Sequence, residues 1–299
     1  MNSLIFIVVL FICGGALRKT GLFSKQAPIQ FNLYVIYVAL PALILKTLPS
    51  ISINESMLKV VAIAWMAILL SVIAVLFISK KLGLSREITG VLLLLVPFGN
   101  TSFVGIPLIS ALVGEKGLPT VIIYDQLGSF LGMILYGSWV LAVYSGAEKP
   151  SIQILLKRML LFPPFWALVL ALSFPMFWQM DVIQAPISTL SNTLIPIVMI
   201  ALGLQFEWRL PYKYFNAFIS GLILKLIIIP ASLLSIINFL DWQGLSIKVS
   251  LLESAMAPMI SAGALAIASN LAPKLVAAML SWGLIISFIT VPLWYQFIF

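Results

Sequence analysis

The chain has 299 residues, of which 62% are hydrophobic and only 9% are charged. A soluble domain of this size does not need so much apolar surface, so the composition excludes a soluble globular protein and indicates an all-α polytopic membrane protein. The net charge of +8 would favour nucleic acid as a partner of a soluble protein, but here the basic residues lie in short loops between apolar segments, so we expect a lipid bilayer and no nucleic acid as the partner.

Ten apolar segments are long enough to cross a bilayer as helices. We interpret the first as a membrane helix and not a signal peptide, because no basic residue precedes it. The segments lie at residues 2–18, 29–48, 57–79, 88–112, 119–145, 155–177, 186–206, 214–238, 247–269 and 274–298. The loops between them are short, so we expect the protein to act within the membrane.

The basic residues predict the orientation of the chain. The loops after the odd-numbered segments hold Arg18, Lys19, Lys25, Lys80, Lys81, Arg86, Lys149, Lys157, Arg158, Arg209, Lys213 and Lys274. The opposite loops hold only Lys59, Lys116 and Lys248, with Lys46 near the end of the second segment. Because short cytoplasmic loops are enriched in lysine and arginine, we expect both termini to face the outside.

The two halves of the chain share a weak internal pattern. Prolines and helix breaks recur in the same order, at Pro28, Pro41, 97–107 and Pro119 in the first half and at Pro186, Pro196, Pro258 and Pro273 in the second. A repeat of five spans is odd-numbered, so its second copy enters the membrane inverted. The pattern therefore predicts two inverted five-helix repeats, residues 1–145 and 146–299, in which helices 4 and 9 are interrupted at matching positions.

The fourth segment contains the most irregular stretch. Four residues disturb its helical pattern: Pro97, Gly99, Gly105 and Pro107. Between them, Asn100 and Thr101 place an amide and a hydroxyl near the bilayer centre. Membrane helices tolerate such a break where the backbone is buried in protein or lines a cavity. We expect Asn100 to donate to a ligand carboxylate beside the N-terminus of the second half-helix. The alternative is a proline-kinked helix that serves packing.

The ninth segment has a corresponding break at Pro258, flanked by Ser254, Ser261 and Gly263. Two breaks at matching places would let the half-helices cross, so that two N-termini face one cavity. We therefore assign Asn100, Thr101, Gly99 and Ser261 to substrate binding. The alternative for the two serines is a hydroxyl that bonds to a carbonyl of its own helix.

Three charged residues lie inside predicted spans: Asp125, Lys225 and Glu253. An isolated charge at the bilayer centre costs a few kcal/mol, so such residues usually face a cavity or one another. We consider them candidates for coupling transport to a proton or a sodium ion. The alternatives are a structural ion pair between Lys225 and Glu253, and a solvated Asp125 near a helix end.

Several motifs resemble the auxin efflux carrier family, which includes bacterial permeases and shares a superfamily with bile acid/sodium symporters. The most specific is NTSFVGIPL at residues 100–108, supported by AMAP at 255–258, YDQL at 124–127 and LPA at 40–42. The resemblance implies ten helices in two inverted repeats, crossed helices 4 and 9, scaffold and transport domains, and organic anions such as malate, malonate or auxin-like acids as substrates. One departure is Gly99, where the plant carriers have proline.

Our leading hypothesis is therefore a secondary active permease for a small organic anion, located in a bacterial inner membrane, with a homodimer as one possible assembly. A facilitative channel or a membrane-embedded sensor is the alternative. A membrane-embedded enzyme is disfavoured, because the chain has no histidine and only one of its aspartates lies well inside a span. The single cysteine, Cys13, excludes an internal disulfide, and we expect no metal and no cofactor.

Overall fold

The structure, a computed structural model, describes residues 2–24, 26–51, 54–146, 151–208 and 212–299. Helices make up 85% of it, and the described residues contain no strands. This confirms the predicted all-α fold. Lys25, Lys149 and Arg209, three of the basic residues behind the predicted orientation, lie outside the described residues.

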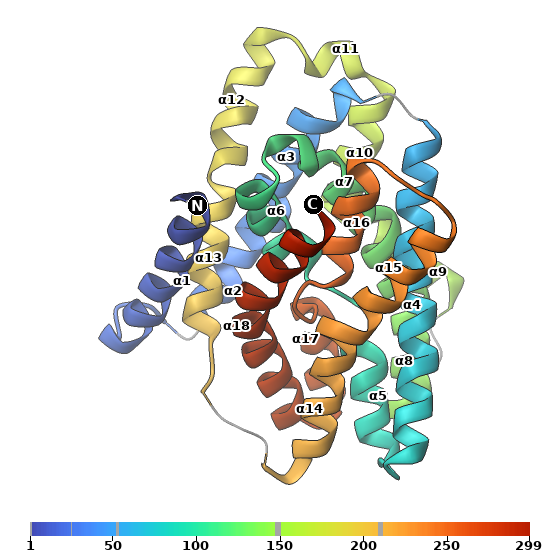
Figure 1. Cartoon of the computed structure of the whole chain (residues 1–299). Coiled ribbons are helices and arrows are strands. Elements are labelled where there is room, and N and C mark those ends of the chain that lie inside the picture. The colour runs from blue at the N-terminus through green and yellow to red at the C-terminus, as the bar shows by residue number, and fades with distance from the viewer. Residues whose placement is uncertain (1, 25, 52–53, 147–150, 209–211) are drawn as a thin grey trace.

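The helices pack around a centre of buried residues, and Figure 1 shows their arrangement. The α-helices are α1 (Asn2–Thr20), α2 (Ala27–Tyr34), α3 (Leu40–Thr47), α4 (Glu55–Lys81), α5 (Arg86–Leu95), α6 (Ile106–Leu112), α7 (Leu118–Ile123), α8 (Ser138–Ser145), α9 (Ile152–Leu160), α10 (Pro163–Ser173), α11 (Pro175–Trp178), α12 (Asp181–Asn192), α13 (Leu194–Gln205), α14 (Phe215–Ile223), α15 (Ile229–Phe239), α16 (Leu245–Ser254), α17 (Ile260–Ala268) and α18 (Pro273–Ile298). Short 3-10 or π-helical segments are η1 (Val35–Ala39), η2 (Leu48–Ser50), η3 (Thr101–Gly105), η4 (Glu115–Gly117), η5 (Tyr124–Phe130), η6 (Met133–Gly137), η7 (Tyr212–Tyr214) and η8 (Leu224–Ile228).

Seven helices of the described chain are long and apolar enough to cross a membrane, and an eighth span results if α9 and α10, which are bent by 68° at their junction, count as one. The predicted fourth and ninth spans differ from the others. Each consists of two short helices, α5 with Thr101–Leu112 and α16 with α17. The chain leaves the helical path near Pro97 and Pro258, because proline removes a backbone donor. The described helices do not by themselves give the ten helices of the predicted inverted repeats.

The helix ends follow from local sequence. Asn54 caps α4, since its Oδ1 accepts the backbone N–H of Ser56 at 3.1 Å, and Ser85 caps α5 by accepting from Ile88 at 3.4 Å. The last turn of α4 carries Lys80 and Lys81, which complement the negative end of the helix.

Three π-helical segments have a common cause. Val35–Ala39, Thr101–Gly105 and Leu224–Ile228 each end two residues before a proline: Pro41, Pro107 and Pro230. Proline cannot donate to the carbonyl four residues earlier, and its ring crowds that carbonyl, so the preceding turn widens. The carbonyl freed by Pro230 belongs to Leu226, and it accepts a hydrogen bond from Trp294 Nε1 at 2.9 Å.

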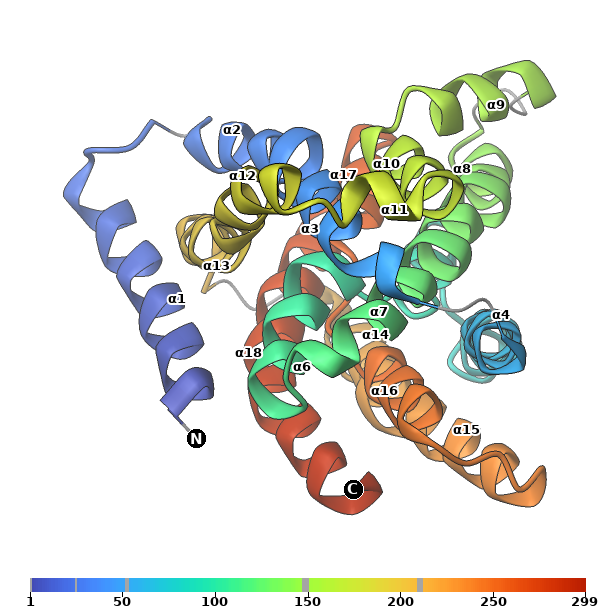
Figure 2. The ribbon, with the colours of Figure 1, turned by 90° about the horizontal axis from the view of Figure 1, so that it is seen from above.

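The helices pack in two groups, which we call the lateral group and the central group. In the lateral group α1 packs along α13, while α3 packs against α10 and α12. The central group contains the broken spans with α4, α7, α14, α15 and α18. Figure 2 shows α1, α2, α12 and α13 on one side and α4, α14, α15 and α16 on the other. Each half of the sequence therefore contributes helices to both groups.

Candidate functional site

The two helix breaks meet at the centre of the molecule. Gly99 and Pro258 form an isolated antiparallel bridge. The backbone N–H of Asn100 donates to Ala257 O at 2.7 Å, and that of Met259 donates to Phe98 O at 3.0 Å. These bonds satisfy backbone groups that the breaks leave without helical partners, which a buried break in a membrane protein requires.

The paired segments are largely buried. Phe98 is 0% exposed and Ala257 is 1% exposed, and the last seven residues of α5, 89–95, are buried as well. Pro97 lies in the turn that follows α5, and Pro258 lies in the bridge itself. Neither proline has an N–H to offer, so each interrupts its helix without leaving a buried donor unpaired.

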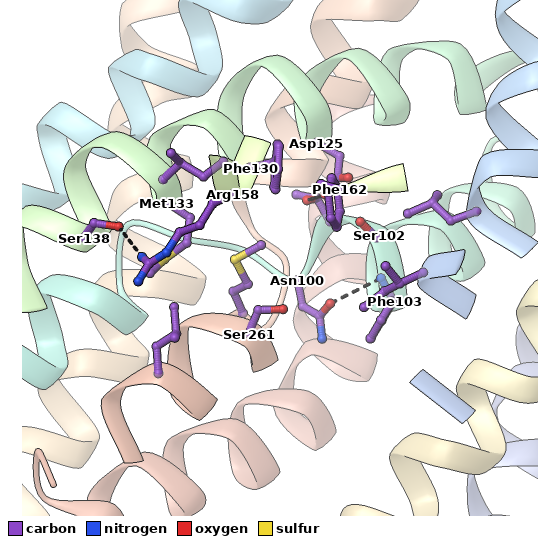
Figure 3. A pocket seen from close by; sticks show the side chains of 16 residues that line it. Asn100, Ser102, Phe103, Asp125, Phe130, Met133, Ser138, Arg158, Phe162 and Ser261 are labelled. Carbon is purple, nitrogen blue, oxygen red and sulfur yellow. Dashed lines mark hydrogen bonds between the residues drawn. The ribbon is translucent and has the colours of Figure 1, made fainter. Parts of the chain in front are cut away.

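The helices that leave the two breaks begin at one cavity of about 210 Å³ (Figure 3). Asn100, Thr101 and Ser102, at the N-terminus of Thr101–Leu112, line it together with Met259 and Ser261, at the N-terminus of α17. The first N–H groups of a helix have no partner within the helix and carry a partial positive charge. Two such ends at one cavity favour a negatively charged ligand.

Asn100 has two structural roles in this cavity. Its backbone joins the breaks, and its Oδ1 accepts the backbone N–H of Phe103 at 3.2 Å, which caps the second half-helix. The side chain is 5% exposed. Because the cap uses the amide oxygen, the NH₂ group of Asn100 is left as a donor for a ligand.

Asp125, on η5, forms another wall of the cavity and is 4% exposed. Thr101 Oγ1 donates to its Oδ1, and Gln126 Nε2 donates to its Oδ2 at 2.7 Å. Both carboxylate oxygens therefore have neutral donors. Asp125 is not solvated near a helix end, since it is bound to the broken helix itself.

Arg158, on α9, also lines the cavity and was not among the site residues predicted from the sequence. Its Nη1 donates to Ser138 Oγ at 3.0 Å, as Figure 3 shows. Beside it, the rings of Phe130 and Phe162 are stacked with centroids 4.0 Å apart. The pattern of basic loops already accounts for Arg158 as an orientation signal, so no separate feature of the sequence indicates that it lies at the site.

Lys225 and Glu253 lie beside Gly99 of the paired breaks. Neither is among the described residues that line this cavity. Lys225 Nζ donates to Ser254 O at 3.2 Å, at the last residue of α16, where a cation complements the negative helix end. Among the described residues no carboxylate lies within 4.0 Å of Lys225 Nζ, so the direct ion pair with Glu253 considered above does not form. Glu253 is 0% exposed, and neither of its carboxylate oxygens has a hydrogen-bond partner in the described part of the chain.

Two glycines leave room for these charged groups. A Cβ atom on Gly105 would lie within 2.8 Å of Glu253 Cδ. A Cβ atom on Gly99 would lie 3.2 Å from Glu253 O and 3.3 Å from Lys225 Nζ. Gly99 therefore faces Lys225 and Glu253. It was predicted to bind substrate, but it is not among the described residues that line the cavity.

The remaining predicted residues have structural positions. Pro107 occupies the first turn of α6, and Gly263 lies inside α17, where a Cβ atom would come within 2.6 Å of Leu280. Neither marks a second interruption of its helix. The Ser254 hydroxyl donates to Leu251 O at 2.6 Å, as the packing alternative expects, whereas Ser261 lines the cavity.

A second, larger cavity of about 890 Å³ lies one helical turn further along the same helices. Leu40 and Phe103 line the first cavity, whereas Leu43 and Ile106 line the second. Leu40 and Leu43 both lie on α3, where three residues of α-helix span about 4.5 Å, so the two cavities approach each other along this helix. At the second cavity Lys46 Nζ lies 3.7 Å from Glu115 Oε1.

Comparison with known proteins identifies relatives over the whole chain. The family described as "Membrane transport protein" matches residues 1–295, and it is the auxin efflux carrier-like family that the motifs resemble. A protein of Methanothermobacter thermautotrophicus described as an uncharacterized transporter is 30% identical over 98% of this chain and 96% of its own length. Another uncharacterized transporter, from Methanocaldococcus jannaschii, is 27% identical over 98% of this chain and 97% of its own.

Proposed function

The chain belongs to the membrane transport protein family, and from this premise we propose that it is a secondary carrier for a small organic anion. The observation that supports the proposal most is the cavity at the paired breaks, where two helix N-termini and the amide of Asn100 meet. Helix N-termini stabilise carboxylates by their N–H groups and their dipoles. Arg158 supplies a positive side chain to the same cavity.

The binding step follows from these donors. A ligand carboxylate accepts hydrogen bonds from the Asn100 NH₂ group and from the free N–H groups at the start of Thr101–Leu112 and α17. The Ser261 hydroxyl is a further donor. The stacked rings of Phe130 and Phe162 provide an apolar surface for the rest of the acid. Both oxygens of the Asp125 carboxyl group accept hydrogen bonds from Thr101 and Gln126, so they are directed at these two side chains.

Transport requires access from both sides in turn. We assign the cavity of about 210 Å³ to the cytoplasmic side, because it contains the basic-loop residue Arg158, and the cavity of about 890 Å³ to the outside. The segments Leu40–Leu43 and Phe103–Ile106 then separate two half-channels. In this proposal the broken spans count as membrane crossings 4 and 9, which gives ten crossings in two inverted repeats with both termini outside. The lateral group serves as the scaffold, and the central group moves against it.

Glu253 is the residue we assign to coupling. An ionised carboxylate without partners in an apolar interior costs several kcal/mol. It therefore carries a proton, or it binds a sodium ion, when the protein is in the observed conformation. Asp125 is the second candidate, and Lys225 acts as a fixed cation at the end of α16.

The experiment that tests the function has two parts. Purified protein is screened by thermal shift against dicarboxylates and aromatic acids, with and without sodium and at two pH values, and the hits are followed as radiolabelled uptake into proteoliposomes. A carrier gives saturable uptake and counterflow. Unitary currents in electrical recordings would favour the channel alternative, binding without uptake would favour a sensor, and conversion of a hit would favour an enzyme.

A further inference from the structure

A third large cavity lies on the outside of the helix bundle, between α1, the C-terminal end of α13 and α18, where α1 stands apart from α18 in Figure 2. Its volume is about 1060 Å³, and its lining is mostly apolar. The ring of Phe11 forms the floor, with centroid distances of 5.5 Å to Phe288 and 6.0 Å to Phe206. Ile12 and Ile289, which are 60% and 62% exposed, form the rims.

One end of this groove is cationic and aromatic. Arg18 and Lys19, in the last turn of α1, line it together with Trp208. Arg18 Nη1 donates to the carbonyl of Phe206, which holds the guanidinium group at the end of the groove. The Trp208 ring lies 4.7 Å from Phe206 and 5.9 Å from Trp282. Glu207 also lines this end, so the positive charges exceed the negative ones by one.

We propose that this groove binds a phospholipid with an anionic headgroup. Its acyl chain lies along the apolar wall between α1 and α18, and its phosphate contacts Arg18 and Lys19. Tryptophan and basic side chains at the end of an apolar surface are typical of the headgroup level of a bilayer. Basic pockets between membrane helices are binding sites for anionic headgroups. Arg18 is suited to this role because one of its nitrogens is already fixed by Phe206, so little side-chain freedom is lost on binding.

A second copy of the chain fits the groove less well than a lipid. Membrane helices of two identical copies share one orientation, so a two-fold contact through this groove would place both Arg18–Lys19 pairs at the same depth. Like charges brought together at an interface oppose association. An anionic headgroup instead neutralises the pair.

The groove lies between the lateral group and the central group of helices. α1 is fixed to α13, since a Cβ atom on Gly203 would lie within 2.9 Å of Gly14 Cα, and both helices belong to the lateral group. α18 belongs to the central group. A lipid in the groove therefore contacts both groups, whichever solute the protein carries.

Native mass spectrometry in mild detergent tests the proposal, with phosphatidylglycerol and phosphatidylcholine added separately at equal concentration. Wild-type protein should retain phosphatidylglycerol preferentially. The double variant Arg18→Gln/Lys19→Gln should bind it about 25-fold more weakly, on the basis of about fivefold for each removed charge. Because loss of Arg18 also removes the contact with Phe206, Lys19→Gln alone is the second variant, with an expected loss of about fivefold.

The control is Lys80→Gln/Lys81→Gln, which removes two charges from the end of α4 and should leave binding unchanged. Ile12→Trp, which fills the apolar wall without changing charge, should displace the lipid. Equal binding of the two lipids by wild-type protein, an equal loss in the control, or a protein dimer that covers the groove and excludes lipid would overturn the proposal.

Discussion

The backbone N–H of Asn100 donates to the carbonyl of Ala257 at 2.7 Å, and this bond joins two helix breaks that lie more than half the chain apart in sequence. The same residue caps the half-helix that follows it, through the bond from Phe103 N–H to Asn100 Oδ1. One residue therefore links the two paired breaks, through its backbone, to the cavity beside them, through its side chain.

Thr101 supports Asp125 from within the broken helix. Thr101→Val removes the hydroxyl that donates to Asp125 Oδ1 and should lower the free energy of unfolding by about 1–3 kcal/mol, because a buried carboxylate oxygen loses its partner. Thr101→Ser keeps the donor and should stay within about 1 kcal/mol of the wild type. Thermal unfolding in detergent measures both. Equal stability of the Val and Ser variants would show that this hydrogen bond is unimportant.

Gly105 provides space for the Glu253 carboxyl group. In Gly105→Ala the new methyl group would collide with that carboxyl group, and we expect a loss of about 1–3 kcal/mol from overpacking. Gly15→Ala is the matched control, because its Cβ would lie 3.8 Å from the nearest atom, Gly203 O. The prediction fails if the two alanine variants unfold at the same temperature.

Trp294 satisfies the carbonyl that Pro230 leaves free. Trp294→Phe removes the donor to Leu226 O and should cost about 1–3 kcal/mol. In a Pro230→Ala background residue 230 regains an N–H that can bond Leu226 O, so the same Trp294 substitution should cost less. A double-mutant cycle on thermal unfolding measures the coupling, and strictly additive effects would contradict the explanation of the π-helical segment.

Glu253 is expected to bind the coupling ion. Glu253→Gln keeps the shape of the side chain and removes its charge and titration, so uptake into proteoliposomes should no longer respond to imposed proton or sodium gradients. Asp125→Asn tests the second candidate in the same assay, and Glu207→Gln is a control with an exposed carboxyl group. An unchanged gradient dependence in Glu253→Gln would rule out this residue.

Much of the fold follows from the sequence, and the reasons are local. Hydropathy predicts where the helices lie, and Pro97 and Pro258 predict where two of them break. The partner of each break is a long-range property, and no short-range pattern identifies Gly99 as the residue opposite Pro258. Three of the π-helical segments could have been predicted, since a proline follows each of them at the same spacing, at Pro41, Pro107 and Pro230. Tyr124–Phe130 and Met133–Gly137 have no such proline.

The candidate site was harder to predict. Asn100 and Ser261 follow from the breaks, because polar groups in an unwound membrane segment need a cavity. Arg158 could not be predicted, since its charge is equally well explained by the basic loops, and its place at the cavity depends on how α9 packs in three dimensions. The partner of Lys225 is a main-chain carbonyl, that of Ser254, which a search for paired charges does not reveal.

The most direct test of the central claim is the transport rate of Asn100 variants in proteoliposomes. Asn100→Asp keeps the capping oxygen and replaces the donating NH₂ group with an acidic oxygen, and Asn100→Ala removes both. Both variants should lose about 10- to 150-fold in uptake, the value of one hydrogen bond to a charged ligand, and Asn100→Asp should unfold near the wild-type temperature. Asn216→Ala, at an exposed site on α14, should transport normally. Wild-type uptake by a folded Asn100→Asp or Asn100→Ala protein would contradict the assignment of this cavity as the anion site.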